Sequence, residues 1–224
     1  MLENFDPNAA SRDDSGVFGL PFTEGESKMV YLPVPWEVTT SYGGGTSRGP
    51  EAILEASRQV DLYDLEVDRP YRVGLFMKSE SEDVVSWNRE GKLLASEIIE
   101  KGGQIQGNAR LLNVLERVNE LGGKMNSYVY SEVKQLLAEG KVPGIIGGDH
   151  SVPLGAFRAM GEAVGDFGIL HFDAHSDTRN AFEGFQHSHA SIMHNALESV
   201  PQLTRLVQVG IRDFCEEEIT YCVK

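Results

Sequence analysis

Cysteine, long apolar runs and positive charge are all scarce in this sequence, and each scarcity excludes a class of protein. The two cysteines, Cys215 and Cys222, have a spacing that matches no common zinc motif. Two cysteines in 224 residues favour free thiols in a reducing compartment over a disulfide framework. No apolar run approaches the roughly 20 residues that a membrane-spanning helix needs, and the polar, acidic first residues do not look like a signal peptide. We therefore expect a cytoplasmic protein without a membrane segment.

Basic residues are outnumbered by acidic ones. The chain has 20 Lys and Arg against 34 Asp and Glu, which gives a net charge of -14 at pH 7. Proteins that bind nucleic acid or anionic membranes need lysine and arginine to neutralise phosphates, so we expect neither partner. An acidic protein raises the local concentration of a cationic substrate, although solubility alone explains the charge equally well.

Apolar segments alternate with amphipathic segments along most of the chain. Residues 1–27 show little periodicity and predict an N-terminal arm, whereas residues 28–224 predict one α/β domain. Strands are predicted at residues 28–35, 71–77, 142–146, 167–172 and 205–211. Helices are predicted at residues 51–60, 83–100, 109–121, 127–139, 154–164 and 191–198. This alternation indicates a mostly parallel sheet covered by helices on both faces, in which ligands bind beyond the carboxyl ends of the strands.

Two motifs rich in histidine and aspartate stand at such strand ends. Residues 147–151 (GGDHS) follow one predicted strand, and residues 171–177 (HFDAHSD) straddle the end of the next. In an extended segment alternate side chains point the same way, so Asp173, His175 and Asp177 are expected to project together.

His150 adds an imidazole from the neighbouring strand end. Carboxylates mixed with imidazoles suit a borderline divalent ion such as Mn²⁺, Fe²⁺, Co²⁺, Ni²⁺ or Zn²⁺, and the lack of thiolates disfavours a structural zinc site. Ligands from two strand ends can hold a pair of ions, which together deprotonate a shared water. Simpler roles fit two neighbours: we interpret His171 as a buried histidine bonded to the backbone, and Asp149 as a brace that orients His150.

The two motifs resemble the paired metal-binding motifs of the ureohydrolase family, which includes arginase, agmatinase, guanidinobutyrase and formiminoglutamase. The similarity extends from about residue 28 to residue 212. It includes Pro35-Trp36, the glycine-rich loop at residues 43–50 and the VGIR segment at residues 209–212.

The resemblance implies an arginase-like three-layer αβα fold with a binuclear Mn²⁺ site, in which Ni²⁺ is also possible. Its metal ligands would be His150, Asp173, His175 and Asp177, with Asp173 bridging the ions, His150 and Asp177 on one ion and His175 on the other. The catalytic residues would be Asp177 and His189, which shuttles protons or contacts substrate. Ala190 stands where the family has glycine, and the alternative for His189 is a surface histidine.

Part of the family's pattern has no counterpart here. Two further metal-binding aspartates, a glutamate that holds the guanidinium group and the last strands of the sheet lie downstream of the VGIR segment in the family. The sequence up to Lys224 contains no such motif. We expect a longer enzyme whose remaining strands and ligands follow Lys224. A short, non-catalytic relative with an incomplete metal site is the alternative.

The reaction implied by the resemblance is hydrolysis of a carbon–nitrogen bond in a linear amidine, with release of urea from a small cationic guanidino substrate. The resemblance also implies a homo-oligomer, a trimer or hexamer. The Asp177-Thr178 start is similar to agmatinases, and Arg179 stands where arginases carry an asparagine. Agmatine is therefore the leading substrate, which indicates polyamine metabolism. Arginase, guanidinobutyrase, guanidine hydrolase and formiminoglutamase activities stay open. We interpret Arg179 as a partner of Glu183, the alternative being an anionic substrate group.

Overall fold

The computed structural model of the protein describes residues 5–223, whose strands form two parallel sheets. The first sheet has the order β2-β1-β3, and the second pairs β4 with β5. The strands are β1 (Met29–Val34), β2 (Leu75–Met77), β3 (Val142–Gly147), β4 (Phe167–Phe172) and β5 (Leu203–Val209). Parallel pairing with helical crossovers confirms the predicted α/β class. The single sheet expected from the sequence is instead split, because β3 and β4 do not pair with each other.

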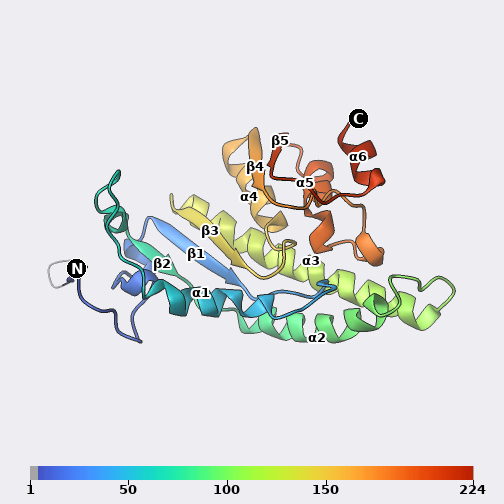
Figure 1. Cartoon of the computed structure of the whole chain (residues 1–224), viewed down its shortest axis with the longest axis horizontal. Helices are drawn as coiled ribbons and strands as arrows, with labels where there is room; N and C mark the ends of the chain where they lie inside the picture. Colours follow the sequence, from blue (N-terminus) through green and yellow to red (C-terminus); the bar gives the residue numbers. More distant parts are fainter. Residues whose placement is uncertain (1–4, 224) are drawn as a thin grey trace.

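Helix α3 (Ala109–Ala138) is the centre of the main core (Figure 1). It packs against α2 (Glu82–Ile99) and α4 (Leu154–Val164), and it contacts β1 and β3. The remaining α-helices are α1 (Gly49–Ser57), α5 (Ile192–Ser199) and α6 (Glu216–Cys222). None of the helices within residues 5–223 combines the length and the apolar character that crossing a membrane requires.

The length of α3 corrects the sequence prediction. The sequence predicts two helices, at residues 109–121 and 127–139, and the two glycines Gly122 and Gly123, which disfavour a helix interior, lie between them. The structure has one continuous helix of 30 residues. Tertiary packing outweighs the local preference here: Gly122 lies so close to His187 that a β-carbon would sit 3.0 Å from the imidazole side chain, and Met125 is completely buried.

Strand β2 is shorter than predicted because a proline and a glycine interrupt the extended chain before it. Pro70 begins a 3-10 helix that extends to Val73, and Gly74 then turns the chain with φ at 79°. Only Leu75–Met77 extends far enough alongside β1 to pair with it. Proline at the start of a helical turn and glycine in the left-handed region are both typical of these positions.

The β4–β5 sheet buries only one of its faces. Phe167 and Ile169 of β4 pack with α4 and α5 in a second core. The alternate residues Leu170 and Phe172 are 60% and 71% exposed, because no helix within residues 5–223 covers that face. His171 follows the period of the packed face and is buried.

Residues 5–27, most of the predicted arm, contain two short 3-10 helices, Val17–Gly19 and Glu24–Glu26. Three hydrogen bonds attach this segment to the end of α1. The guanidinium of Arg58, the residue after the helix, donates twice to the carbonyl of Ser15, and the hydroxyl of Ser57 accepts from the amide of Phe18. Residues 1–4 of that arm lie outside the described part of the chain.

Candidate metal centre

The glycine-rich turn after β3 brings His150 to the carboxyl end of the sheet. Gly148 lies against the backbone of Trp36, so that a β-carbon there would be 2.1 Å from the Trp36 carbonyl oxygen. The amide of Asp149 donates to that same oxygen at 2.7 Å. The Asp149 carboxylate accepts from the amide and hydroxyl of Ser151, at 2.9 and 2.5 Å. Asp149 therefore holds its own turn together, as a loop brace would.

The loop after β4 is attached to the segment that follows β5. The amide of Asp173 donates to the carbonyl of Val209, and the amides of Arg212 and Asp213 both donate to Ala174. Asp177 then adopts a positive φ of 54°, which is uncommon for a residue with a side chain. Its carbonyl accepts from the amides at the start of α5, at Met193 and His194, and these bonds hold the turn in place.

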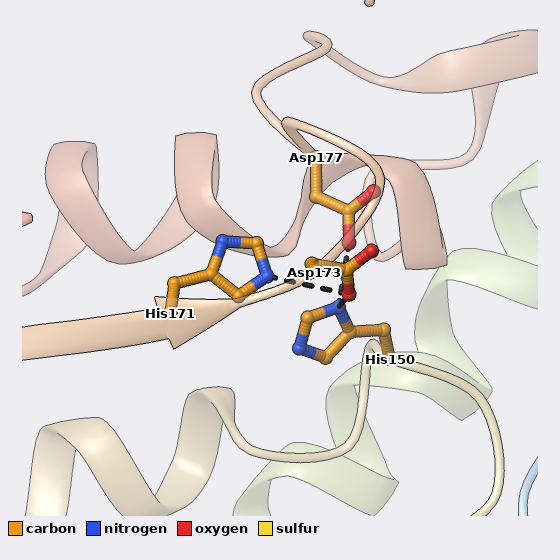
Figure 2. A group of neighbouring side chains, drawn as sticks. All are labelled: His150, His171, Asp173 and Asp177. Carbon is orange, nitrogen blue, oxygen red and sulfur yellow. Dashed lines mark hydrogen bonds and ion pairs between the residues drawn. The ribbon is translucent and has the colours of Figure 1, made fainter. Parts of the chain in front are cut away.

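Four side chains, three from these two loops and one from the end of β4, converge on one point (Figure 2). His150, His171, Asp173 and Asp177 each offer an atom suited to metal binding, and these atoms all lie within 4.8 Å of one another. Nδ1 of His150 is 2.6 Å from Oδ2 of Asp177 and 3.4 Å from Oδ2 of Asp173. Nε2 of His171 is 3.4 Å from the same Asp173 oxygen.

The charges of this cluster act on one another. Burial opposes a charged imidazole at His150, but the hydrogen bond to Asp177 and the two carboxylate charges outweigh it and raise the pKa of His150. Burial opposes ionisation of Asp173 as well, but the amide of His175 and the imidazole of His150 outweigh it and lower the pKa of Asp173. Burial and the charge of His150 lower the pKa of His171.

These residues fit a divalent metal ion. Two carboxylates converge with imidazole nitrogens, and within residues 5–223 their ion-pair partners are histidines rather than lysine or arginine. Converging carboxylates without a fixed cation are suited to a metal ion, and the mixed oxygen and nitrogen donors suit Mn²⁺ or another borderline ion.

Comparison with known proteins assigns the family. Residues 27–224 match the model of the arginase family. The chain belongs to the arginase family. Among its curated relatives are two N(1)-aminopropylagmatine ureohydrolases: one from Thermus thermophilus is 34% identical over 84% of this chain, and one from Synechocystis is 30% identical over 86%. An agmatinase of Bacillus anthracis is 29% identical over 88% of the chain.

Solved structures agree with the family. The agmatine ureohydrolase of Thermoplasma volcanium is 25% identical, covers 89% of this chain and superposes with a TM-score of 0.61. The formiminoglutamase of Trypanosoma cruzi, solved with Mn²⁺, shares the fold with a TM-score of 0.63 at 18% identity over 93% of this chain. The chain spans about half the length of the curated N(1)-aminopropylagmatine ureohydrolases it matches: 53% of the Synechocystis protein and 52% of each Thermus protein. It covers 55% of the Thermoplasma chain and 62% of the Trypanosoma chain.

The structure of this arginase-family chain gathers three of the four predicted ligands: His150, Asp173 and Asp177. The fourth, His175, lies beside them and is turned outward. Its side chain is 61% exposed, with Nδ1 3.3 Å from Oδ1 of Asp173 and Nε2 3.7 Å from Asp213. His175 thus contacts the oxygen of Asp173 that faces away from His150.

The sequence interpretation did not include His171 in the cluster, but the structure does. His171 is buried as expected, but its Nδ1 is bonded to the side chain of Gln208 instead of the backbone, and its Nε2 enters the cluster. The signal was present in the sequence, because His171 and Asp173 are two residues apart at a strand end and alternate side chains share a face.

His189 lies in a short 3-10 helix before α5 and is not among the four clustered groups. Its amide donates to the hydroxyl oxygen of Thr39, and that hydroxyl is 3.3 Å from Nδ1 of its ring. Phe182 packs edge-on against the ring. His189 is half-buried and fixed by these contacts.

Arg179 pairs with a different residue than expected. Its Nε is 3.6 Å from Glu218 of α6, and its guanidinium stacks on Phe182, whereas Glu183 makes no ion pair with it. Glu218 is buried and also accepts from the amide of Thr178 at 3.0 Å. Its second oxygen accepts from the amide of Cys215 at 2.9 Å, so that Glu218 connects α6 to the residue after Asp177.

Substitution Glu218→Ala is expected to weaken metal binding by about 10-fold or more, because the turn that presents Asp177 loses its buried acceptor. Isothermal titration with Mn²⁺ measures the change. Glu217→Ala, on the exposed side of the same helix, is the matched control and should leave the affinity unchanged. Equal affinities in the two variants would show that α6 does not support the metal loop.

Proposed function

We propose that the protein is a metal-dependent hydrolase that cleaves a carbon–nitrogen bond in linear guanidino compounds and releases urea, with agmatine as the leading substrate. The observation that carries this proposal is the convergence of His150, Asp173 and Asp177 beyond the carboxyl ends of β3 and β4. The agmatinase and ureohydrolase relatives support it.

The proposed metal is Mn²⁺, with Ni²⁺ as an alternative, held by His150, Asp173 and Asp177, with His175 as the fourth proposed ligand. When bound, a metal pair supplies Lewis acidity that lowers the pKa of water to near neutrality. Asp173 is suited to a shared position, because its two oxygens face different histidines: Oδ2 faces His150 and Oδ1 faces His175.

The chain's own residues would do the remaining work. Water adds its oxygen to the guanidinium carbon, the bond to the substituted nitrogen breaks, and that nitrogen leaves as an amine that takes up a proton. His189 is proposed to carry this proton from the attacking water to the leaving nitrogen. The Thr39 hydroxyl oxygen accepts from the amide of His189 and can also accept from Nδ1–H, which leaves the lone pair of Nε2 free to take up the proton that water loses and to pass it on. Asp177 would stabilise the cationic carbon centre as well as hold metal.

A longer cationic substrate is the second candidate. The relatives named N(1)-aminopropylagmatine ureohydrolase favour a substrate that carries an aminopropyl group in addition to the guanidino group and amine of agmatine. The net charge of -14 is compatible with either cation.

Urea or ammonia release from a panel of guanidino compounds tests the proposal. The panel comprises agmatine, N(1)-aminopropylagmatine, arginine, guanidinobutyrate, guanidine and formiminoglutamate, each with added Mn²⁺ or Ni²⁺. We expect the highest kcat/KM with agmatine and no activity after chelation of the metal. A clear preference for aminopropylagmatine would select the second candidate. Bound metal without activity on any of these compounds would contradict the substrate assignment. Failure to bind metal would favour a non-catalytic relative.

A further inference from the structure

His171 and Gln208 form a cross-strand pair directly behind the cluster. The register of β4 and β5 places the two residues opposite each other. His171 is 4% exposed, and its Nδ1 is 2.9 Å from Nε2 of Gln208. The same amide nitrogen is 2.7 Å from the carbonyl oxygen of Ser176, in the loop that carries the metal-binding aspartates. One amide group therefore contacts both the imidazole and the loop.

The carbonyl of Ser176 determines which way this amide points. A carbonyl oxygen only accepts hydrogen bonds, so the Gln208 atom that faces it must be the NH₂ group. One hydrogen of that group goes to Ser176, and the other goes to Nδ1 of His171. Nδ1 must then present its lone pair, and a neutral imidazole with a lone pair on Nδ1 carries its hydrogen on Nε2.

That Nε2–H is aimed at the carboxylate of Asp173. The nitrogen is 3.4 Å from Oδ2 of Asp173, and it makes no hydrogen bond within residues 5–223. A dashed line joins the two side chains in Figure 2. A buried donor without a partner is costly, because it has given up its hydrogen bonds to water. A small shift of Asp173 toward this nitrogen would complete a hydrogen bond.

We propose that His171 is a positioning residue, preset by Gln208 as an N–H donor to Asp173, and that it is not a metal ligand. This inference rests on the proposed metal site. The proximity of the four clustered groups alone would include His171 among the ligands, since its Nε2 lies within 4.8 Å of the other three. The two roles require opposite tautomers, because a ligand presents a lone pair and a donor presents a hydrogen.

A donor in this place serves the site in a specific way. A hydrogen bond from His171 to Asp173 fixes the rotation of the carboxylate while leaving its remaining lone pairs free for metal. It also adds no positive charge where a divalent ion and a cationic substrate are proposed to bind. Donors of this kind outside the ligand set change metal affinity by about 10- to 100-fold when removed.

The tautomer is measured first, in metal-free protein labelled with nitrogen-15, by NMR couplings between the ring nitrogens and the carbon-bound ring protons. We expect the hydrogen of His171 on Nε2, and on Nδ1 in the variant Gln208→Glu, whose carboxylate accepts instead of donating. Gln208→Met is the second variant, for use if the glutamate variant fails to fold. Methionine has no donor, so we expect a mixture of the two His171 tautomers. Gln104→Glu, at an exposed position, controls for the added charge. A hydrogen on Nδ1 in the unsubstituted protein would overturn the proposal.

The role toward metal is tested with two substitutions of His171. His171→Gln keeps an amide N–H near the position of Nε2 but no nitrogen lone pair, so Mn²⁺ affinity should stay within about 3-fold, whereas His171→Leu should lose about 10- to 100-fold. Pulsed electron paramagnetic resonance of bound Mn²⁺ counts the coordinated imidazole nitrogens, and we expect the same number before and after His171→Gln. Loss of one nitrogen would make His171 a ligand and overturn the proposal. If the unsubstituted protein bound no metal, the proposed function and the role of His171 toward Asp173 would both be overturned. The tautomer measurement would still test whether Gln208 sets the position of the His171 hydrogen.

Discussion

The substitution Asp173→Asn is expected to lower kcat/KM by about 10³-fold, equivalent to roughly 4 kcal/mol of transition-state stabilisation. Asp173 is the residue that touches most of the site: its carboxylate lies within 3.4 Å of ring nitrogens of His150, His171 and His175. Asparagine keeps the size but removes the negative charge and one acceptor oxygen. Steady-state kinetics with agmatine and a titration of bound Mn²⁺ measure the two losses.

A matched control for this experiment is at the other end of the same strand. Asp166 immediately precedes β4 and is exposed, so Asp166→Asn changes the same chemical group without touching the cluster. We expect its kinetics and metal content to equal those of the unsubstituted protein. Substantial activity in Asp173→Asn, with two ions still bound, would contradict the proposed bridging role. A common loss in both variants would point to a general effect of charge.

Most elements of the fold were predictable because their apolar periodicity agrees with their packing. Strands β1, β3 and β4 and helices α2 and α4 lie within a residue or two of their predicted bounds. The prediction was wrong where tertiary contacts decide the conformation. Helix α3 continues through two glycines because neighbours pack against it, and the break between β3 and β4 depends on pairing between distant segments. Neither effect is visible in a local pattern.

The candidate site shows where the side-chain alternation of a strand stops being a valid guide. Alternation places Asp173, His175 and Asp177 on one side only while the chain stays extended. After Asp173 the chain leaves that conformation, and Asp177 has a φ of 54°, so His175 turns outward while Asp177 reaches the cluster. The alternation held for His171, which lies within the strand. The pairing of Arg179 with Glu218 joins segments far apart in sequence, and only the fold reveals it.

The substitution Gly148→Ala is expected to be among the most destabilising single changes in this chain, by about 3 kcal/mol or more. A β-carbon there would lie 2.1 Å from the carbonyl oxygen of Trp36 and 2.9 Å from that of Val34. Both are backbone atoms, of the buried last residue of β1 and of the buried Trp36 just after it, so they cannot move aside as a flexible side chain could. The turn itself would have to shift, and His150 would move with it. Urea denaturation measures the stability, and titration with Mn²⁺ measures the site.

The best control for this effect is another glycine. Gly123 lies inside α3, where a β-carbon would meet nothing within 4 Å, so Gly123→Ala should raise the stability by about 0.5–1 kcal/mol through helix propensity alone. The two substitutions add the same methyl group, and their effects on stability have opposite signs only because the surroundings of that methyl group differ. If Gly148→Ala unfolded at the same urea concentration as the unsubstituted protein, the close approach of this turn to Trp36 would be wrong. If it lost stability but still bound Mn²⁺ at full affinity, the turn would not be what holds His150 in place.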